Sequence, residues 1–214
     1  DTAATFNDLC TGCSRCVPAC PVGIDIPWIN TVVRDRLNRG ADPDAFDHLV
    51  DGLSPDAEGS GLSLTKRLFG NADALFALGS ATAPVSNWLT SSRAVRAALD
   101  RLAGVDRRRD LPEFRRQTLR DWFEARGGPT VAEADARREA VLYADTYTNY
   151  VHTERGKAAV RALEALGGRV RVPDLPESGR APLSQGMVST AERRAKIVAA
   201  GLAPGRVSAF VQHA

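Results

Sequence analysis

The spacing of apolar residues over the first 128 positions follows the period of an α-helix. In one helix Pro27 suits the first turn, Trp28 and Val32 lie on the apolar side, and Gly40 marks the end. The expected helices run over residues 27–39, 62–78, 84–90, 93–103 and 112–127. Residues 41–61 are rich in turn-forming residues around a short amphipathic piece and predict a connector. The first part of the chain is therefore expected to be helical.

The pattern changes after residue 128, where short apolar runs alternate with helical stretches. Apolar runs at 139–144 and 169–172 predict two buried strands. Between them, Thr153 is expected to cap a helix that ends at Gly167 and Gly168. After the second strand, a proline-rich loop over 173–182 precedes a helix at about 189–200. This β-α-β-α order predicts the start of a parallel sheet with right-handed crossovers.

Two strands do not make a stable open sheet, so the sheet is expected to continue beyond the sequence. The chain begins at Asp1 without a methionine, and it stops at Ala214 in a stretch whose pattern reads as a helix. We therefore expect a fragment of a longer chain with two domains. One spans residues 1–128, and the other is a partial α/β domain over 129–214.

Four cysteines stand within eleven residues near the start, and the sequence contains no others. They are Cys10, Cys13, Cys16 and Cys20, followed directly by Pro21. This is the bacterial ferredoxin spacing C-x2-C-x2-C-x3-C-P, typical of thiolates that bind a cubane iron-sulfur cluster. Gly12 lets the backbone approach the cluster closely. The sequence predicts an α-helical ferredoxin-like domain that carries a 4Fe-4S cluster, with these four cysteines as the metal ligands.

Two other uses of the four cysteines fit the pattern poorly. Structural zinc sites usually have two C-x2-C pairs separated by a dozen or more residues, and that arrangement is absent. Disulfides require an oxidising compartment and a geometry that short C-x2-C links seldom reach. Iron and sulfide remain the best explanation, and they predict a role in electron transfer.

The last cysteine, Cys20, lies about one helical turn beyond Cys16 and is expected to point away from the first three. In two-cluster ferredoxins the fourth cysteine of such a run binds the other cluster. Only nine residues precede Cys10, too few for a second run. Either all four cysteines close around one cluster, or Cys20 serves a second cluster shared with residues upstream of this fragment. The spacing favours the second arrangement.

The overall composition excludes several other classes of function. With 43% hydrophobic and 25% charged residues, the chain has the composition of an ordinary globular protein. No apolar stretch approaches the roughly 18 residues of a spanning helix, and no signal peptide precedes the cysteines, so a cytoplasmic location is expected. The arginines are interleaved with acidic residues, which gives no support to nucleic-acid binding. No glycine-rich dinucleotide fingerprint follows either strand, so flavin and nicotinamide sites are expected elsewhere.

The residues around the cysteines resemble a known group of proteins. The stretch FNDLCTGCSRCVPACPVGIDIP is similar to a cluster motif of the lactate-utilisation iron-sulfur proteins (LutB-like). The iron-sulfur subunits of glycolate oxidase and of anaerobic glycerol-3-phosphate dehydrogenase are relatives of that group. The resemblance implies a second cysteine run upstream and a flavin-containing dehydrogenase domain or subunit as partner. Any contact with a membrane would be peripheral and through such a partner.

The later stretch VLYADTYTNY, with SGRAPLSQGM further on, resembles the cysteine-rich CCG domain of heterodisulfide reductase and LutA-like subunits. Its cysteines are missing here. Thr146 stands at one thiolate position, and Glu177 and Ser178 stand at two others. The domain is therefore expected to keep its scaffold without a metal site. Arg180 and Ser178 could instead bind a carboxylate, although a structural role for Arg180 is the simpler interpretation.

The sequence as a whole favours the iron-sulfur electron-transfer component of a flavin- or quinone-linked oxidoreductase. The resemblance implies a 2-hydroxy acid, lactate in particular, as the substrate of that complex. We expect no catalytic site in this chain alone. The alternative is a non-catalytic assembly scaffold in which the cluster is only structural, and reversible reduction of the cluster separates the two.

Overall fold

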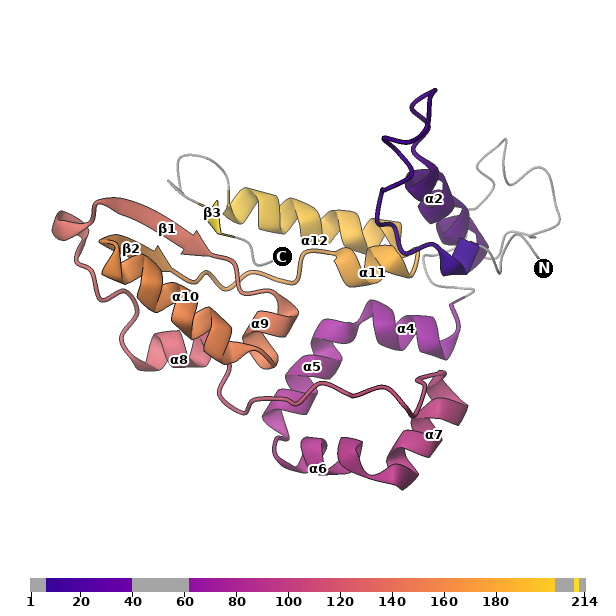
Figure 1. The fold of residues 1–214 in the computed structure, drawn as a ribbon, viewed down its shortest axis with the longest axis horizontal. Coiled ribbons are helices and arrows are strands. Elements are labelled where there is room, and N and C mark those ends of the chain that lie inside the picture. The colour runs from indigo at the N-terminus through magenta and orange to yellow at the C-terminus, as the bar shows by residue number, and fades with distance from the viewer. Residues whose placement is uncertain (1–6, 40–61, 203–209, 212–214) are drawn as a thin grey trace. The chain divides into compact units, whose positions relative to one another are not determined.

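The computed structural model describes residues 7–39, 62–202 and 210–211 (Figure 1). The chain divides into two compact units, each discontinuous in sequence. One unit comprises Asp1–Ala72 and Gly179–Arg194, and the other comprises Asp73–Ser178 and Ala195–Ala214. The boundary predicted at residue 128 stays a prediction, because these units reflect contacts within the folded chain and not independent folding. The connector predicted at 41–61 lies outside the described residues.

The first unit is built around helix α2 (Ile26–Asn38), which follows the cysteines and agrees with the predicted helix at 27–39. The Asp25 side chain caps it by accepting a hydrogen bond from the Trp28 backbone N–H at 3.0 Å. Further helices of this unit include α4 (Leu64–Gly70), α11 (Arg180–Ser184) and the beginning of α12 (Val188–Gly201). Helix α11 begins inside the stretch that was predicted to be a loop.

A close approach at Gly70 brings α4 against the segment after α11. A Cβ atom at Gly70 would lie only 2.5 Å from Sδ of Met187, so the methionine side chain would have to shift to admit one. The helix predicted over 62–78 is interrupted at this point, because α4 ends at Gly70 and α5 (Ala72–Ala81) begins after Asn71. Asn71 is the C-cap of α4, with φ −111° and ψ 33°. The prediction of one continuous helix was therefore wrong.

The second unit contains a parallel sheet in the order β2-β1-β3. Strand β1 (Arg138–Leu142) pairs with β2 (Gly168–Arg171), and the two agree with the predicted strands to within a residue or two. Helix α10 (Thr153–Ala165) connects them, although His152 and not Thr153 occupies its N-cap position. Strand β3 (Phe210–Val211) lies on the other side of β1. The sequence pattern predicts a helix at the end of the chain, and this prediction was wrong for Phe210 and Val211.

The apolar core of the second unit lies between the sheet and helices α8 (Leu119–Ala125) and α10. Its fully buried members come from the sheet, from α8 and from α10: Leu119, Leu142, Val160 and Val170. Gly156 allows α10 to approach this core, since a Cβ atom there would lie 2.4 Å from a Leu119 methyl group. The mixture of helices and a small parallel sheet agrees with the predicted fold class.

One predicted helix in the second unit is much shorter than expected. The pattern placed its start near Pro112, but α8 begins at Leu119, where Thr118 and Asp121 form a capping box. The preceding chain is held in a non-helical form by Asn87, whose amide accepts from the Phe114 N–H at 2.8 Å and donates to the Phe114 carbonyl at 2.9 Å. Asn87 belongs to α6 (Val85–Ser91), which with α7 (Arg93–Ala103) confirms two predicted helices.

Candidate metal centre

The four cysteines lie on an irregular segment between Asn7 and the start of α2. Three left-handed residues shape it: Gly12 has φ 67°, Gly23 has φ 70°, and Ser14 has φ 59°, which is uncommon for a residue with a side chain. Successive turns follow, with the Val17 N–H bonded to the Ser14 carbonyl and the Cys20 N–H bonded to the Val17 carbonyl. This backbone brings the cysteines to the surface on one short loop.

All four thiols are free of disulfides. Cys13 and Cys16 are exposed, and Cys10 and Cys20 are partly buried. Among the described residues, no three or more side chains of His, Cys, Asp or Glu are close enough to hold a metal ion. The loop therefore supplies the right ligand type and spacing, while its sulfur atoms do not converge on one point.

The surroundings favour the ionised form of three of the four cysteines. The pKa of Cys10 is lowered by a hydrogen bond from the Asn30 side chain, then by the Gly12 backbone and the positive charge of Arg34. The pKa of Cys13 is lowered by the Arg15 backbone N–H and then by the Thr11 side chain.

Backbone N–H groups also act on the last cysteine. The pKa of Cys20 is lowered first by the Ile24 N–H, which lies 3.4 Å from its Sγ, and then by the backbone of Val22. The thiolate is the form that binds iron. The chemistry of this donor set therefore fits an iron-sulfur cluster, with Cys10, Cys13, Cys16 and Cys20 as its candidate ligands.

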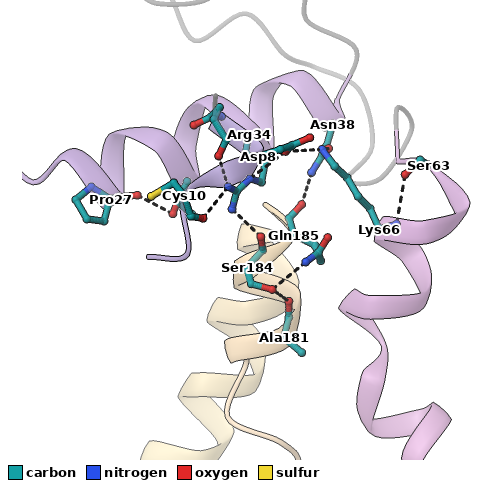
Figure 2. A network of polar contacts seen from close by, with 12 residues as sticks. Asp8, Cys10, Pro27, Arg34, Asn38, Ser63, Lys66, Ala181, Ser184 and Gln185 are labelled. Carbon is teal, nitrogen blue, oxygen red and sulfur yellow. Dashed lines mark hydrogen bonds and ion pairs between the residues drawn. The ribbon is translucent and has the colours of Figure 1, made fainter. Parts of the chain in front are cut away.

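A polar network ties the first cysteine to helices α2 and α11 (Figure 2). Arg34 donates to the carbonyl oxygens of Asn7, of Cys10 at 3.0 Å and of Ser184 at 2.6 Å. Its guanidinium also lies 3.4 Å from a carboxylate oxygen of Asp8. One helical turn later, Asn38 donates to the Gln185 carbonyl at 2.6 Å. The cysteine loop is thereby fixed by a segment that is distant in the sequence.

A cavity of ≈ 450 Å³ opens beside Cys13. Trp28 and Arg180 are among the residues that line it, and the Trp28 side chain remains 53% exposed. The sequence left open whether Arg180 binds a carboxylate or has a structural role. The structure places this arginine in the unit that carries the cysteines, a position that the sequence did not predict.

The loops after β1 and β2 carry Thr146 and Glu177, two of the residues that stand at cysteine positions of the resembled CCG pattern. Thr146, which begins helix α9 (Thr146–Tyr150), and the buried Glu177 line one cavity of ≈ 300 Å³, together with Asp73 and Arg120. Arg120 binds Asp174 through an ion pair of 2.6 Å. Sequence reasoning missed Asp73 and Arg120, because neither lies in a motif.

Burial and charge perturb a tyrosine beside this cavity. Desolvation, followed by the nearby Glu177 carboxylate, raises the pKa of Tyr143 to about 12. Its hydroxyl donates a hydrogen bond to the Pro176 carbonyl at 2.7 Å, which keeps it neutral and in place. The cavity lies between the loops after β1 and β2 and is lined mostly by polar side chains.

Comparison with known proteins agrees with the chemistry of the cysteine loop. Residues 5–24 match the family model of the 4Fe-4S binding domain. The chain therefore contains a 4Fe-4S binding domain, and a 4Fe-4S cluster is its cofactor.

Two curated relatives extend the similarity well beyond the cysteine loop. Each is a subunit of anaerobic glycerol-3-phosphate dehydrogenase, one from Escherichia coli K12 and the other from Escherichia coli O157:H7. Each is 26% identical over 134 residues, which is 62% of this chain and 33% of the relative. The chain thus spans about a third of the length of the relatives that it matches. No solved structure matches this chain. The relatives are among the groups that the sequence resembles.

The described residues contain no helix that is both long and apolar enough to cross a bilayer.

Proposed function

We propose that this chain is the iron-sulfur electron-transfer part of a dehydrogenase complex. The observation that carries the proposal is the set of four disulfide-free cysteines within the 4Fe-4S match, three of them in surroundings that favour thiolate. Cys10, Cys13 and Cys16 bind one cluster in this proposal. Cys20 binds a second cluster whose other ligands lie upstream, as the ferredoxin spacing favours.

The proposed partner is a flavin-containing dehydrogenase domain or subunit. Oxidation of an alcohol removes two electrons together, whereas an iron-sulfur cluster carries them singly, so a carrier such as a flavin, which accepts two electrons and releases them one at a time, is needed between the two. The proposed substrate of the complex is a 2-hydroxy acid, lactate in particular, as the resemblance implies. Glycerol 3-phosphate is the competing substrate, because the curated relatives are subunits of its dehydrogenase. A cytoplasmic location belongs to the same proposal.

Reversible reduction of the cluster is the decisive test. The full-length protein, purified without oxygen, should give a paramagnetic resonance signal on reduction with dithionite and lose it on reoxidation, without loss of iron. A cluster that holds iron but cannot be reduced reversibly would contradict electron transfer and support the scaffold alternative.

The substrate is tested in the cells that produce the protein. Under anaerobic conditions, rapidly frozen cells supplied with lactate should show the reduced cluster. Cells supplied with glycerol 3-phosphate should not. The reverse result would replace the proposed substrate and leave the electron-transfer role intact.

A further inference from the structure

The side chain of Arg34 is a buried positive charge next to the first candidate ligand. It is 4% exposed, and three of its hydrogen-bond acceptors are neutral backbone carbonyls, including that of Cys10. Its nearest counter-charge is Asp8, whose carboxylate is half exposed and is shared with Lys66 at 3.0 Å. The positive charge of Arg34 is therefore only partly balanced inside the protein.

A second group on the same helix acts on the sulfur of the same cysteine. Asn30 lies four residues before Arg34 in α2, so the two side chains share one face of the helix. A hydrogen bond from the Asn30 side chain to the Cys10 sulfur is the largest cause of the lowered pKa of this thiol. One face of α2 thus offers Cys10 both a hydrogen bond and a positive charge.

We propose that Asn30 and Arg34 are positioning and tuning residues that raise the reduction potential of the cluster bound through Cys10. Reduction adds an electron to a cluster that already carries negative charge from its thiolate ligands. A nearby positive charge and a hydrogen bond to the sulfur both stabilise the reduced form more than the oxidised form. The proposal rests on the proposed function, since it requires Cys10 to be a ligand.

The sign of each substitution follows from its charge. Arg34→Gln should reduce the ratio of reduced to oxidised cluster at a fixed ambient potential by about tenfold, which for a one-electron couple is about 59 mV. Asn30→Leu, which removes only the hydrogen bond, should reduce it by about threefold. Arg34→Lys keeps the charge and should recover most of the ratio. Asp8→Asn should increase it, because the counter-charge of Arg34 is lost.

Arg36→Gln is the matched control. It removes the same charge from the same helix, but two residues of α-helix turn by roughly 200°, which places Arg36 on the opposite side from Arg34. The ratio should stay unchanged in this variant. The effect of Arg34→Gln should also persist at high salt, since a buried charge is screened weakly.

The measurement is a potentiometric titration of the full-length protein without oxygen, followed by the resonance signal of the reduced cluster. Opposite shifts of the reduction potential in Arg34→Gln and Asp8→Asn support the proposal. A general loosening of the loop would shift the potential in the same direction in both variants. If Arg34→Gln does not retain its cluster, the reduction potentials of Asn30→Leu and Asp8→Asn test the proposal instead.

Two results would overturn the tuning role. One is an unshifted potential in variants that retain the cluster, and the other is an equal shift in Arg36→Gln. Either result with a reversibly reduced cluster in the unmodified protein leaves the proposed function standing. An unmodified protein whose cluster cannot be reduced overturns both.

Discussion

The hydroxyl of Thr146 donates a hydrogen bond to a carboxylate oxygen of Asp73 across 3.1 Å. Thr146 stands where the resembled CCG pattern has a cysteine, so an oxygen pair occupies the position at which that pattern has a thiolate. The buried Glu177, which replaces a second cysteine of that pattern, lines the same cavity. At these positions the loops after β1 and β2 therefore present oxygen atoms, which are poor ligands for an iron-sulfur cluster.

This relationship predicts that only the N-terminal cysteines hold iron. A variant with Cys10, Cys13, Cys16 and Cys20 all changed to serine should contain no iron after treatment with iron and sulfide. The unmodified protein, treated in the same way, is the control, and iron is measured by colorimetric analysis. Iron retained by the variant at a stoichiometric level would show that the loops around Thr146 and Glu177 bind it.

A single substitution in the cysteine loop should remove the cluster. Cys13→Ser should abolish the brown colour and the thiolate-to-iron absorption of the protein purified without oxygen, because a hydroxyl replaces a thiolate ligand. The matched control is Ser14→Gly, which lies beside it and should keep the cluster, since Ser14 has φ 59° and glycine adopts that conformation readily. A colourless unmodified protein with stoichiometric zinc would refute the cluster.

The role of Cys20 is tested in a longer protein that includes the upstream cysteine run implied by the resemblance. If Cys20 serves a second cluster, this protein should hold about eight iron atoms per chain, and Cys20→Ser should remove one cluster selectively. Iron content and the resonance spectrum measure both effects. A single cluster that is destroyed by Cys20→Ser would show that all four cysteines close around the same iron atoms.

The core of the second unit should depend strongly on Leu119. This side chain is fully buried between α8 and α10, so Leu119→Ala should lower the free energy of unfolding by about 2–5 kcal/mol. Leu166→Ala removes the same atoms from a side chain that is 73% exposed, and its effect should be small. Urea unfolding followed by circular dichroism measures both, and equal losses would place the core elsewhere.

Acid should destabilise the protein through Glu164. Burial tends to raise the pKa of this carboxyl group, but hydrogen bonds from Arg126 and from the Thr130 N–H outweigh it and hold the pKa below the ordinary value of 4.5. A group with a lowered folded pKa contributes stability above its unfolded pKa and loses it as the pH falls through the folded pKa. This part of the stability should therefore be present above about pH 4.5 and decline below it.

The variant Glu164→Gln tests this dependence. It should be less stable than the unmodified protein at neutral pH, and the difference should shrink as the pH falls below 4.5. The control is Glu113→Gln, whose carboxylate is exposed and lies 3.7 Å from the Arg115 guanidinium at the surface. Urea unfolding at a series of pH values measures the effect, and a constant difference at every pH would contradict it.

Local sequence patterns determined the elements whose signals are short in range. The period of 3.6 residues and Pro27 predicted α2, and alternating apolar runs and helical stretches predicted β1, α10 and β2. The cysteine spacing identified the cluster loop, because the thiolate ligands of one cluster must lie close together and one short loop can supply several of them. In each of these cases the deciding interactions lie within one turn, one strand or one loop.

Tertiary contacts decided what these patterns could not. The start of α8 was wrong because Asn87, 27 residues away, binds both backbone groups of Phe114 and keeps the preceding chain out of a helix. Arg34 donates hydrogen bonds to the carbonyl oxygens of Cys10 and Ser184, which lie 24 and 150 residues away from it in the sequence. Such contacts depend on how distant segments pack, and burial strengthens their electrostatic effect on the cysteine. The sequence alone therefore identified the candidate ligands, while the folded chain determined the charges and hydrogen bonds around them.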